Sequence, residues 1–241
     1  MEKPGRLVAI DIAGSVRWEV ELRNQNRPLK PALYAQHLAV GLDGRVYCGG
    51  CQIQFGGSSP AVFAVADGKI SWIAEPQGYP SKRGQFCGGV ALYERDGAVR
   101  EVYASTTHLR ITNGEGGGLY ALDPGTGRTL AEFTGGIGGM TAPVVDAAGT
   151  VYVGIRGKHP FGRTPAVNGR VFAWTRGGGS KFRPVWEFDA DGQLDWAAPA
   201  IGAKGSLYFG STAPVSPILQ VQFFKRGEDP KASPKFYGIF E

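Results

Sequence analysis

Residue types that bind ligands or transfer protons are concentrated in two connections, each following an apolar segment that contains tyrosine. One connection holds His108 and Arg110, and the next holds Arg156, Lys158, His159 and Arg163. Imidazole, guanidinium and ammonium groups on neighbouring loops attract anions. We therefore predict that these six residues line a site for an anionic ligand or an acidic surface. The alternative interpretation is that the lysines and arginines only keep exposed loops soluble.

Asp195 and Trp196 are two further candidates, at the start of a segment of small apolar residues. Asp195 is the carboxylate best placed to face the centre of the expected fold. A single aspartate in such a place is more often a hydrogen-bonding turn residue than a general base. We include Asp195 and Trp196 in the predicted ligand site and predict no catalytic residue.

Three cysteines, Cys48, Cys51 and Cys87, are weak candidates for a metal or redox site. Cys48 and Cys51 have the C-x-x-C spacing of zinc sites and redox pairs, but the chain has no second C-x-x-C. Thioredoxin-like chemistry also requires a strand-to-helix junction, which the sequence does not indicate. We predict no resident metal and interpret these cysteines as small thiols or loop residues.

The segments that position these residues repeat along the chain. Alanine occupies the centre of four short apolar runs, at Ala9, Ala64, Ala121 and Ala173, with spacings of 55, 57 and 52 residues. Between the runs a second pattern recurs, at 45–47, 101–103, 150–152 and 206–208, and each copy ends in tyrosine. Short apolar runs and Gly-rich turns with a period of about 50 residues predict a β-propeller, in which one period is one four-stranded blade.

Turn residues give the order of strands within each blade. Innermost strand A includes 141–145 and 197–201, strand B is the Tyr-containing pattern and strand C is the Ala-centred run. The outer strand D carries one large aromatic residue per blade: Trp18, Trp72, Phe133, Trp186 and Tyr237. We predict that the tryptophans Trp18, Trp72 and Trp186 are structural and largely buried between blades.

The repeats do not add up to whole blades. Five C/D hairpins but only four A/B hairpins are present, because the first strand, near Leu7, is already a C strand. We therefore predict an all-β fold, a small or incomplete propeller of about four full blades plus an N-terminal half blade, in a single domain over residues 1–241. Open blade edges expose unpaired backbone groups, so self-association through them is one expectation.

Connection lengths indicate which face of the propeller carries function. The B/C connections at 49–60, 105–117, 154–169 and 211–217 are long, as are the D/A connections at 22–35 and 75–85. Both sets open on the same face, and long loops on one rigid scaffold commonly carry binding residues. The six candidate histidine, arginine and lysine residues lie in these connections, whereas Asp195 and Trp196 lie at the entry to a strand A.

The segment Gly118-Leu119-Tyr120-Ala121-Leu122-Asp123-Pro124-Gly125-Thr126-Gly127-Arg128 resembles the repeat of the PQQ-like β-propellers, in which PQQ is pyrroloquinoline quinone. The segment 143–154 resembles strands A and B of that family. Enzymes of the family bind PQQ and Ca²⁺ near the propeller axis, often above a disulfide between adjacent cysteines. This chain has no adjacent cysteines, and the tryptophan of the family motif is replaced by Ala131.

The resemblance leaves two functions open. We favour a non-catalytic scaffold that binds a protein, peptide or anionic glycan through its long-loop face and needs no cofactor. The alternative is a PQQ-dependent oxidoreductase, or a fragment of one, that binds PQQ and Ca²⁺.

Composition supports these expectations. The 241 residues include 38 glycines and 16 prolines, which suit many tight turns, and the net charge of +5 favours an acidic partner. No recognised nucleic-acid motif and no membrane-spanning run of roughly 18 to 20 apolar residues is present, so we expect neither partner. The residues at the N-terminus predict a cytoplasmic protein as the sequence is written, or a periplasmic or extracellular one if a leader has been removed.

Overall fold

The computed structural model describes residues 6–22, 34–51, 61–75, 85–107, 117–134, 139–155, 157, 168–190, 192–194, 198–212, 219–224 and 235–236. Within these residues every regular element is a β-strand, as expected from the high glycine content and the short apolar runs. The predicted all-β class is confirmed.

Five antiparallel sheets follow one another along the chain. Blade 1 contains only two strands, β1 (Arg6–Ile10) and β2 (Val16–Glu21). Blades 2, 3 and 4 are four-stranded: β3 (Tyr34–Val40), β4 (Val46–Cys51), β5 (Ala61–Ala66), β6 (Lys69–Ala74); β7 (Gln85–Arg95), β8 (Ala98–Thr107), β9 (Gly118–Leu122), β10 (Thr129–Thr134); β11 (Val144–Val145), β12 (Val151–Ile155), β13 (Arg170–Thr175), β14 (Arg183–Asp189). Blade 5 contains β15 (Gln193–Leu194), β16 (Ala200–Ile201), β17 (Leu207–Thr212), β18 (Leu219–Phe224) and β19 (Lys235–Phe236), with β15 and β16 both paired to β17.

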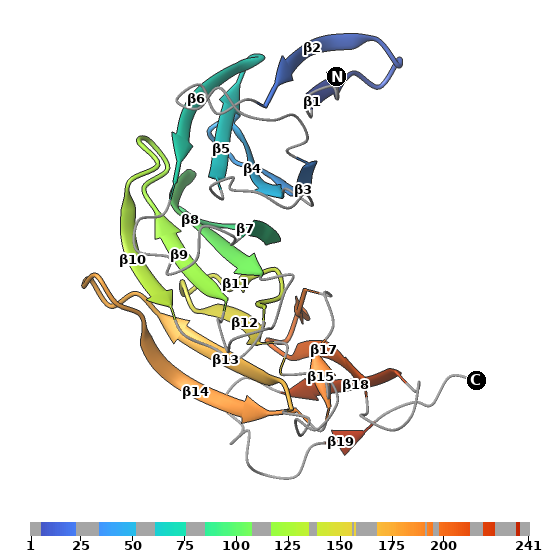
Figure 1. Ribbon diagram of the computed structural model, residues 1–241, viewed down its shortest axis with the longest axis vertical. Coiled ribbons are helices and arrows are strands. Elements are labelled where there is room, and N and C mark those ends of the chain that lie inside the picture. The colour runs from blue at the N-terminus through green and yellow to red at the C-terminus, as the bar shows by residue number, and fades with distance from the viewer. Residues whose placement is uncertain are drawn as a thin grey trace.

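The blades are arranged as an open arc (Figure 1). Inner strands β3, β7 and β11 lie along the concave side, and outer strands β6, β10 and β14 lie along the convex side. The strand order predicted from the turns is the order observed in blades 2 to 4. The predicted N-terminal half blade is also confirmed, because β1 and β2 occupy the C and D positions of a sheet whose other strands are not supplied by the described residues.

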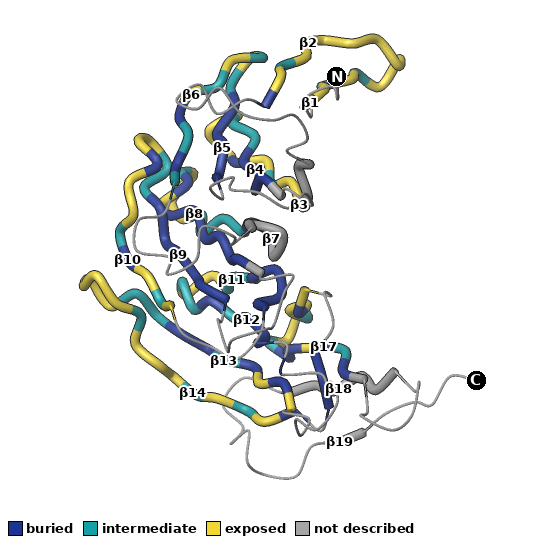
Figure 2. Tube along the Cα trace, viewed as in Figure 1, coloured by how far each residue is buried: buried dark blue, intermediate teal, exposed yellow. Residues whose placement is uncertain are grey.

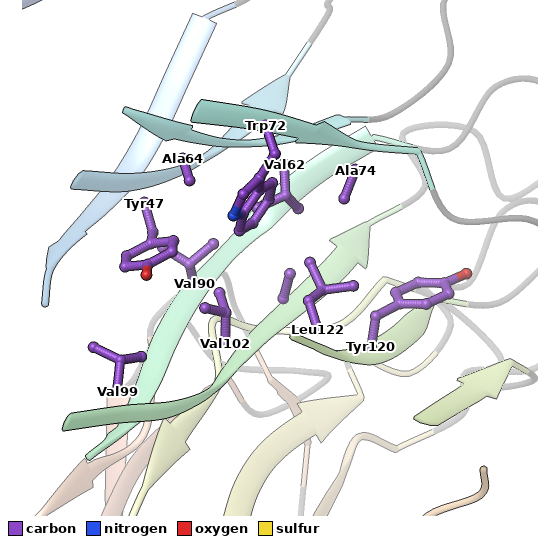
Figure 3. Packing of buried hydrophobic residues seen from close by; sticks show 11 residues of the cluster. Tyr47, Val62, Ala64, Trp72, Ala74, Val90, Val99, Val102, Tyr120 and Leu122 are labelled. Atoms are coloured by element: carbon purple, nitrogen blue, oxygen red, sulfur yellow. The ribbon is translucent and has the colours of Figure 1, made fainter. Parts of the chain in front are cut away.

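An apolar core lies between each pair of neighbouring blades. One such core joins blades 2 and 3, where Tyr47, Val62 and Trp72 of blade 2 meet Val102 and Leu122 of blade 3 (Figure 3). Equivalent clusters join blades 1 and 2, 3 and 4, and 4 and 5. Because side chains alternate along a strand, one set of each blade faces the preceding blade and the other set faces the following blade.

The three tryptophans of the D strands differ in burial. Trp72 is 8% exposed, whereas Trp18 and Trp186 are half-buried at the edges of their clusters. Each stands opposite the central alanine of its C strand, as Trp18↔Ala9 in blade 1. The structural role that we predicted is thus supported for all three by their packing, but strong burial holds only for Trp72.

Glycine in the C/D turn allows a tryptophan of the preceding blade to pack closely. Gly127, with φ of +72°, is so near Trp72 that a Cβ atom would lie 2.6 Å from the ring. At Gly68, with φ of +71°, a Cβ atom would lie 2.9 Å from the Cβ atom of Trp18 and 3.3 Å from its ring. A side chain at either position would require both a strained backbone and displacement of the neighbouring blade.

Candidate functional site

The long connections begin where strands B and D end, on the face opposite the short A/B and C/D turns. The candidate residues His108, Arg110, Arg156, Lys158, His159, Arg163, Asp195 and Trp196 all lie outside the described residues. The structure does describe the strand ends from which their loops begin. We therefore describe the strand ends at the base of each loop.

Two of the loop bases are joined directly. The backbone N–H of Met140 donates to the carbonyl oxygen of Thr106 at 3.1 Å, and Met140 also forms an antiparallel bridge with Ile155. Thr106 precedes the loop that carries His108 and Arg110, and Ile155 precedes the loop that carries the other cationic residues. The two basic loops therefore begin at neighbouring points of adjacent blades.

One buried hydroxyl group fixes the base of the first loop. The Thr106 Oγ1 atom accepts a hydrogen bond from the Gly118 N–H at 2.7 Å, which closes the loop between strands β8 and β9. Thr106 is fully buried. At Gly117 a Cβ atom would lie 2.7 Å from both the Met140 side chain and the Thr106 carbonyl, so glycine is required for this close approach.

Two further buried hydroxyl groups connect blades 3 and 4. Ser105 Oγ donates to the Thr141 carbonyl at 2.8 Å, and the Thr141 Oγ1 atom accepts from the Gly154 N–H at 2.9 Å. Ser105 and Thr141 are both buried. Buried polar groups with their hydrogen bonds formed hold a backbone in one arrangement, so the loops leave from a rigid base.

The base near Asp195 and Trp196 is also closed by backbone hydrogen bonds. Gly169 donates to the Gly192 carbonyl at 2.7 Å and accepts from the Ala190 N–H at 2.9 Å. The short strand β15 then ends at Leu194, which is 2% exposed. On the neighbouring strand β17, the fully buried Ser211 hydroxyl has no hydrogen-bond partner within the described part of the chain.

His37, on the inner strand β3, is a further candidate for ligand binding that was not among the residues chosen from the sequence. Register places His37, Gly89, Ala142 and Ala198 at the same position of four successive A strands, two residues before the residue opposite the strand-B tyrosine. His37 lies at the irregularity in strand β3, is exposed and has φ of +52°. Such a bulge can re-aim a side chain. The irregularity and the positive φ appear only in the structure, and nothing in the sequence around His37 predicted them.

Of the three cysteines, only the side chain of Cys48 is described, and it is buried in strand β4. Burial raises the pKa of the Cys48 thiol to about 12, which disfavours the thiolate that acts as nucleophile and metal ligand. Strand β4 runs unbroken through Cys48–Cys51, so the motif is not at a strand-to-helix junction. The side chains of Cys51 and Cys87 lie outside the description, and no cluster of three or more metal-ligating side chains occurs among the described residues.

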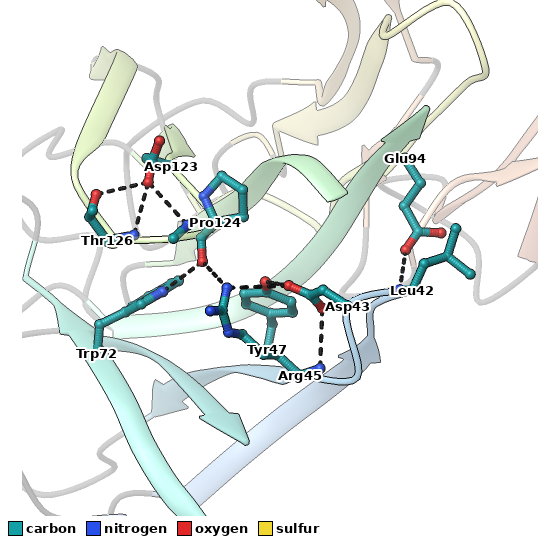
Figure 4. Close-up of polar contacts among 10 residues, drawn as sticks. Leu42, Asp43, Arg45, Tyr47, Trp72, Glu94, Asp123, Pro124 and Thr126 are labelled. Atoms are coloured by element: carbon teal, nitrogen blue, oxygen red, sulfur yellow. Dashed lines mark hydrogen bonds and ion pairs between the residues drawn. The ribbon is translucent and has the colours of Figure 1, made fainter. Parts of the chain in front are cut away.

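On the opposite face, polar side chains are engaged within the fold. Asp43 binds the Tyr47 hydroxyl at 2.6 Å, while the Arg45 guanidinium and the Trp72 indole N–H both donate to the Pro124 carbonyl, at 3.0 and 2.8 Å (Figure 4). Asp123 accepts hydrogen bonds within its own C/D turn, and the bond from the Thr126 side chain is the main cause of its lowered pKa. The hydrogen bonds of these groups are made within turns and between blades.

Solved structures with a similar arrangement cover most of the chain. BamB from Moraxella catarrhalis matches 92% of this chain and 52% of its own, with 18% identity and a TM-score of 0.54. The Cps50 (Swd1) β-propeller domain of Myceliophteria thermophila matches 98% of this chain and 66% of its own, with 13% identity and a TM-score of 0.56. The fold is that of a β-propeller.

A third similar structure is the quinohemoprotein alcohol dehydrogenase from Comamonas testosteroni, with 18% identity, a TM-score of 0.53, and coverage of 81% of this chain and 33% of that chain. The chain thus spans about half the length of BamB and about a third of the dehydrogenase. No family model and no curated protein matches the sequence. At these identities the likeness shows the fold alone, and membership of the PQQ-like family remains a prediction that these neighbours are consistent with.

The described residues contain no helix long and apolar enough to span a membrane.

Proposed function

We propose that this propeller is a non-catalytic binding scaffold whose long-loop face binds an acidic protein or peptide, or an anionic glycan. The observation that carries this proposal is the connection of Thr106 to Ile155 through Met140. It joins the bases of the two loops that contain most of the candidate cationic residues. Loops that start side by side on a rigid base can present their charges to one ligand.

On the short-turn face, by contrast, the carboxylates are already used within the fold. Its carboxylates at Asp11, Asp43, Asp123 and Asp146 each accept backbone N–H bonds from their own turns. Side chains used in this way stabilise turns and are not available to a partner. The long-loop face is therefore the better candidate for ligand binding.

Charge reversal in the second basic loop tests the proposal. The variant R156E/K158E should bind a fluorescein-labelled poly-glutamate peptide or a heparin oligosaccharide at least about tenfold more weakly, because two attractive charges become repulsive. Affinity of the unmodified protein should also fall as salt is raised, since exposed charges are screened beyond about 8 Å at physiological ionic strength. Fluorescence anisotropy at two salt concentrations measures both effects.

The matched control is K69E/K204E, which makes the same charge change at two exposed residues on the short-turn face: Lys69, the first residue of β6, and Lys204 in the A/B turn of blade 5. This control should retain affinity to within about twofold, and both variants should melt within a few degrees of the parent. Equal loss in the two variants would show that only net charge matters. No loss in R156E/K158E would contradict the proposed site.

A PQQ-dependent oxidoreductase is the alternative, favoured by the likeness to the quinohemoprotein dehydrogenase. PQQ would supply a two-electron redox centre, and Ca²⁺ would need several oxygen ligands to hold it. No three carboxylate, histidine or cysteine side chains cluster among the described residues. In addition, Asp43, Asp123 and Asp146 are engaged in turns and Glu101 is paired with Arg176. Addition of PQQ and Ca²⁺, followed by absorbance spectroscopy and alcohol-dependent dye reduction, tests this alternative.

A further inference from the structure

Two neighbouring inner strands are irregular at the same position. In β3 the register with β4 shifts by one residue between Gln36 and Leu38, which makes His37 the extra residue. In β7 the register with β8 shifts between Gln85 and Gly89, and Gly89 is the register equivalent of His37. His37 has φ of +52° and Gly89 has φ of +121°. A register shift with a positive φ indicates a β-bulge, which turns a side chain away from the regular alternation of the strand.

The two bulges meet on the concave side of the arc. A Cβ atom at Gly89 would lie 3.1 Å from the Cβ atom of His37 and 2.7 Å from that of Ala142, the equivalent residue of blade 4. The inner strands of blades 2, 3 and 4 therefore converge at this level, and a side chain at position 89 would fill the space beside the imidazole. His37 is exposed, and Figure 2 shows further exposed residues on β3 next to the buried strands β4 and β5.

The backbone of His37 has a conformation that glycine adopts more easily. For a residue with a Cβ atom a positive φ is strained, and such strain persists only where the surrounding structure holds it. The ladder pairs Gln36↔Gly49 and Leu38↔Cys48 hold β3 on both sides of the bulge. Strained residues are concentrated at ligand sites. The presence of histidine where blade 3 has glycine therefore favours a role for the imidazole itself.

The strand segments that meet at His37 carry no carboxylate. Strands β3, β4 and β11 contain no charged residue, and the charged residues of β7 are Glu94 and Arg95, at its far end. Glu94 already accepts a hydrogen bond from the Leu42 N–H at 2.7 Å. An imidazole donates through a ring N–H, so a carboxylate that binds His37 would come from outside these strands. The net charge of +5 favours such an acidic group.

The bulges lie beside the bases of the basic loops. Gly89 is paired with Ser105, one residue before Thr106. The Thr106 carbonyl accepts the Met140 N–H and so joins the bases of the two basic loops. His37, next to Gly89, is thus placed to contact the part of a ligand that projects from those loops towards the concave side.

We propose that His37 binds a carboxylate of an acidic peptide segment at the concave end of the long-loop face. The inference rests on the proposed function and adds a contact that the loops do not supply. Because three inner strands converge at this level, the group that reaches His37 is a slender acidic side chain such as glutamate and not a sulfated sugar ring. The imidazole N–H donates to one oxygen of the carboxylate.

The variant H37G separates ligand contact from a structural role. Its melting temperature should stay within about two degrees of the parent, because relief of the positive φ offsets the greater freedom of glycine in the unfolded chain. Its affinity for a fluorescein-labelled poly-glutamate peptide should fall about fivefold or more, because a hydrogen bond to a charged group is lost. H37N is the matched control, since asparagine accepts a positive φ and keeps an N–H donor, and its affinity should stay within about twofold of the parent.

A second measurement does not depend on peptide binding by the loops. The chain contains three histidines, His37, His108 and His159, so the imidazole signal that H37N loses from the proton NMR spectrum is that of His37. Addition of glutarate, a small dicarboxylate, should shift that signal in the parent protein. The neutral diamide glutaramide at the same concentration should leave it in place.

Failure of this inference can be told from failure of the proposed function. The carboxylate contact is wrong if H37G keeps its affinity for poly-glutamate, if H37G melts well below the parent, or if glutarate leaves the His37 signal unshifted. A loss of affinity for a heparin oligosaccharide alone in H37G would identify a glycan as the ligand and would also overturn it. If the parent does not bind poly-glutamate but glutarate shifts the His37 signal, the proposed function is wrong and the carboxylate contact stands.

Discussion

The interface between blades 2 and 3 and the interface between blades 3 and 4 build the same geometry from different residues. Strand B contributes Tyr47 to the first and Tyr103 to the second, and both rings are fully or almost fully buried. In blade 2 the ring next to Tyr47 is Trp72 of the same blade, with centroids 5.9 Å apart. In blade 3 the tryptophan position is Ala131, which cannot supply that contact.

A ring from the next blade replaces the missing tryptophan. Phe182, at the end of the C/D turn of blade 4, lies with its ring centroid 6.1 Å from that of Tyr103. Backbone contacts hold the turn in place, because Glu132 of β10 donates its N–H to the Ser180 carbonyl at 3.1 Å and bridges to Lys181. The longer turn of blade 4 therefore compensates for Ala131.

The first residue of the strand-B pattern has opposite charge at the two interfaces. Arg45 in blade 2 reaches the Pro124 carbonyl of the blade 3 turn at 3.0 Å. The equivalent Glu101 in blade 3 accepts from the Tyr103 hydroxyl at 2.6 Å and pairs with Arg176 of the blade 4 turn. In both interfaces strand B is joined to the next C/D turn, but the charge on strand B is opposite. Backbone register is thus repeated, while the chemistry that connects blades is specific to each pair.

Truncation of the aromatic rings should produce the largest effect. W72A should lower the free energy of unfolding by about 3 to 5 kcal/mol, because it removes a buried ring and its hydrogen bond to Pro124. F182A should cost less, about 2 kcal/mol, because Phe182 is only half-buried. Urea denaturation followed by circular dichroism measures both.

The reciprocal substitution A131W sharpens this comparison. Ala131 is 1% exposed, so an indole there has no room beside Phe182 and should destabilise the fold by about 1 to 3 kcal/mol through overpacking. Greater stability in A131W would show that the interface between blades 3 and 4 is underfilled. In that case Phe182 would not be a replacement for the tryptophan.

Removal of the arginine that joins strand B to the next C/D turn should destabilise the two interfaces by different amounts. R176L leaves the buried Glu101 carboxylate without its counter-ion and should cost about 2 to 3 kcal/mol, below the range for fully buried pairs because the Arg176 side chain is 29% exposed. R45L should cost only about 1 kcal/mol, since Trp72 still donates to the Pro124 carbonyl. Chemical denaturation of each variant at neutral pH provides the values.

The double variant E101Q/R176L is the control for this charge effect. A neutral amide removes the unpaired carboxylate, so stability should recover relative to R176L alone. If E101Q/R176L is no more stable than R176L, the loss arises from packing of the arginine side chain. Equal losses in R45L and R176L would remove the difference between the two interfaces.

Sequence periodicity predicted the strands well because the backbone pattern repeats. Central alanines, strand-B tyrosines and Gly-rich turns recur at regular intervals, and each marks the strand it was expected to mark in blades 2 to 4. The contacts that join blades were not predicted. Arg45 and Pro124 are 79 residues apart and Glu101 and Arg176 are 75 apart, and neither pair repeats in residue type. Periodicity identifies positions, whereas the partner at each position depends on which two blades meet.

The candidate site could be predicted only in part. Strand topology supports a separate long-loop face, but its candidate residues, from His108 to Trp196, lie outside the described residues and remain predictions. The hydroxyl groups of Ser105, Thr106 and Thr141 were missed because serine and threonine near strand ends are common and carry no distinctive spacing. The sequence did not predict that Trp18 and Trp186 would be less buried than Trp72, since one position in the repeat meets a different neighbour in each blade.

Alkaline titration of the two strand-B tyrosines should show the smallest difference between the interfaces. Burial raises the pKa of Tyr103 and of Tyr47 above the ordinary value, and hydrogen bonds to Glu101 and Asp43 raise them further. Below pH of about 10 both states of the protein keep these tyrosines protonated. Above it the unfolded chain loses protons that the folded chain retains, so stability falls by up to about 1.4 kcal/mol per pH unit for each tyrosine. Y103F and Y47F should each reduce that slope between about pH 10 and 11, measured by urea denaturation at closely spaced pH values. A larger reduction of the pH slope in one variant would identify the interface whose tyrosine remains protonated further into the alkaline range. If the stability of both variants falls with pH as steeply as that of the parent, neither tyrosine controls alkaline stability.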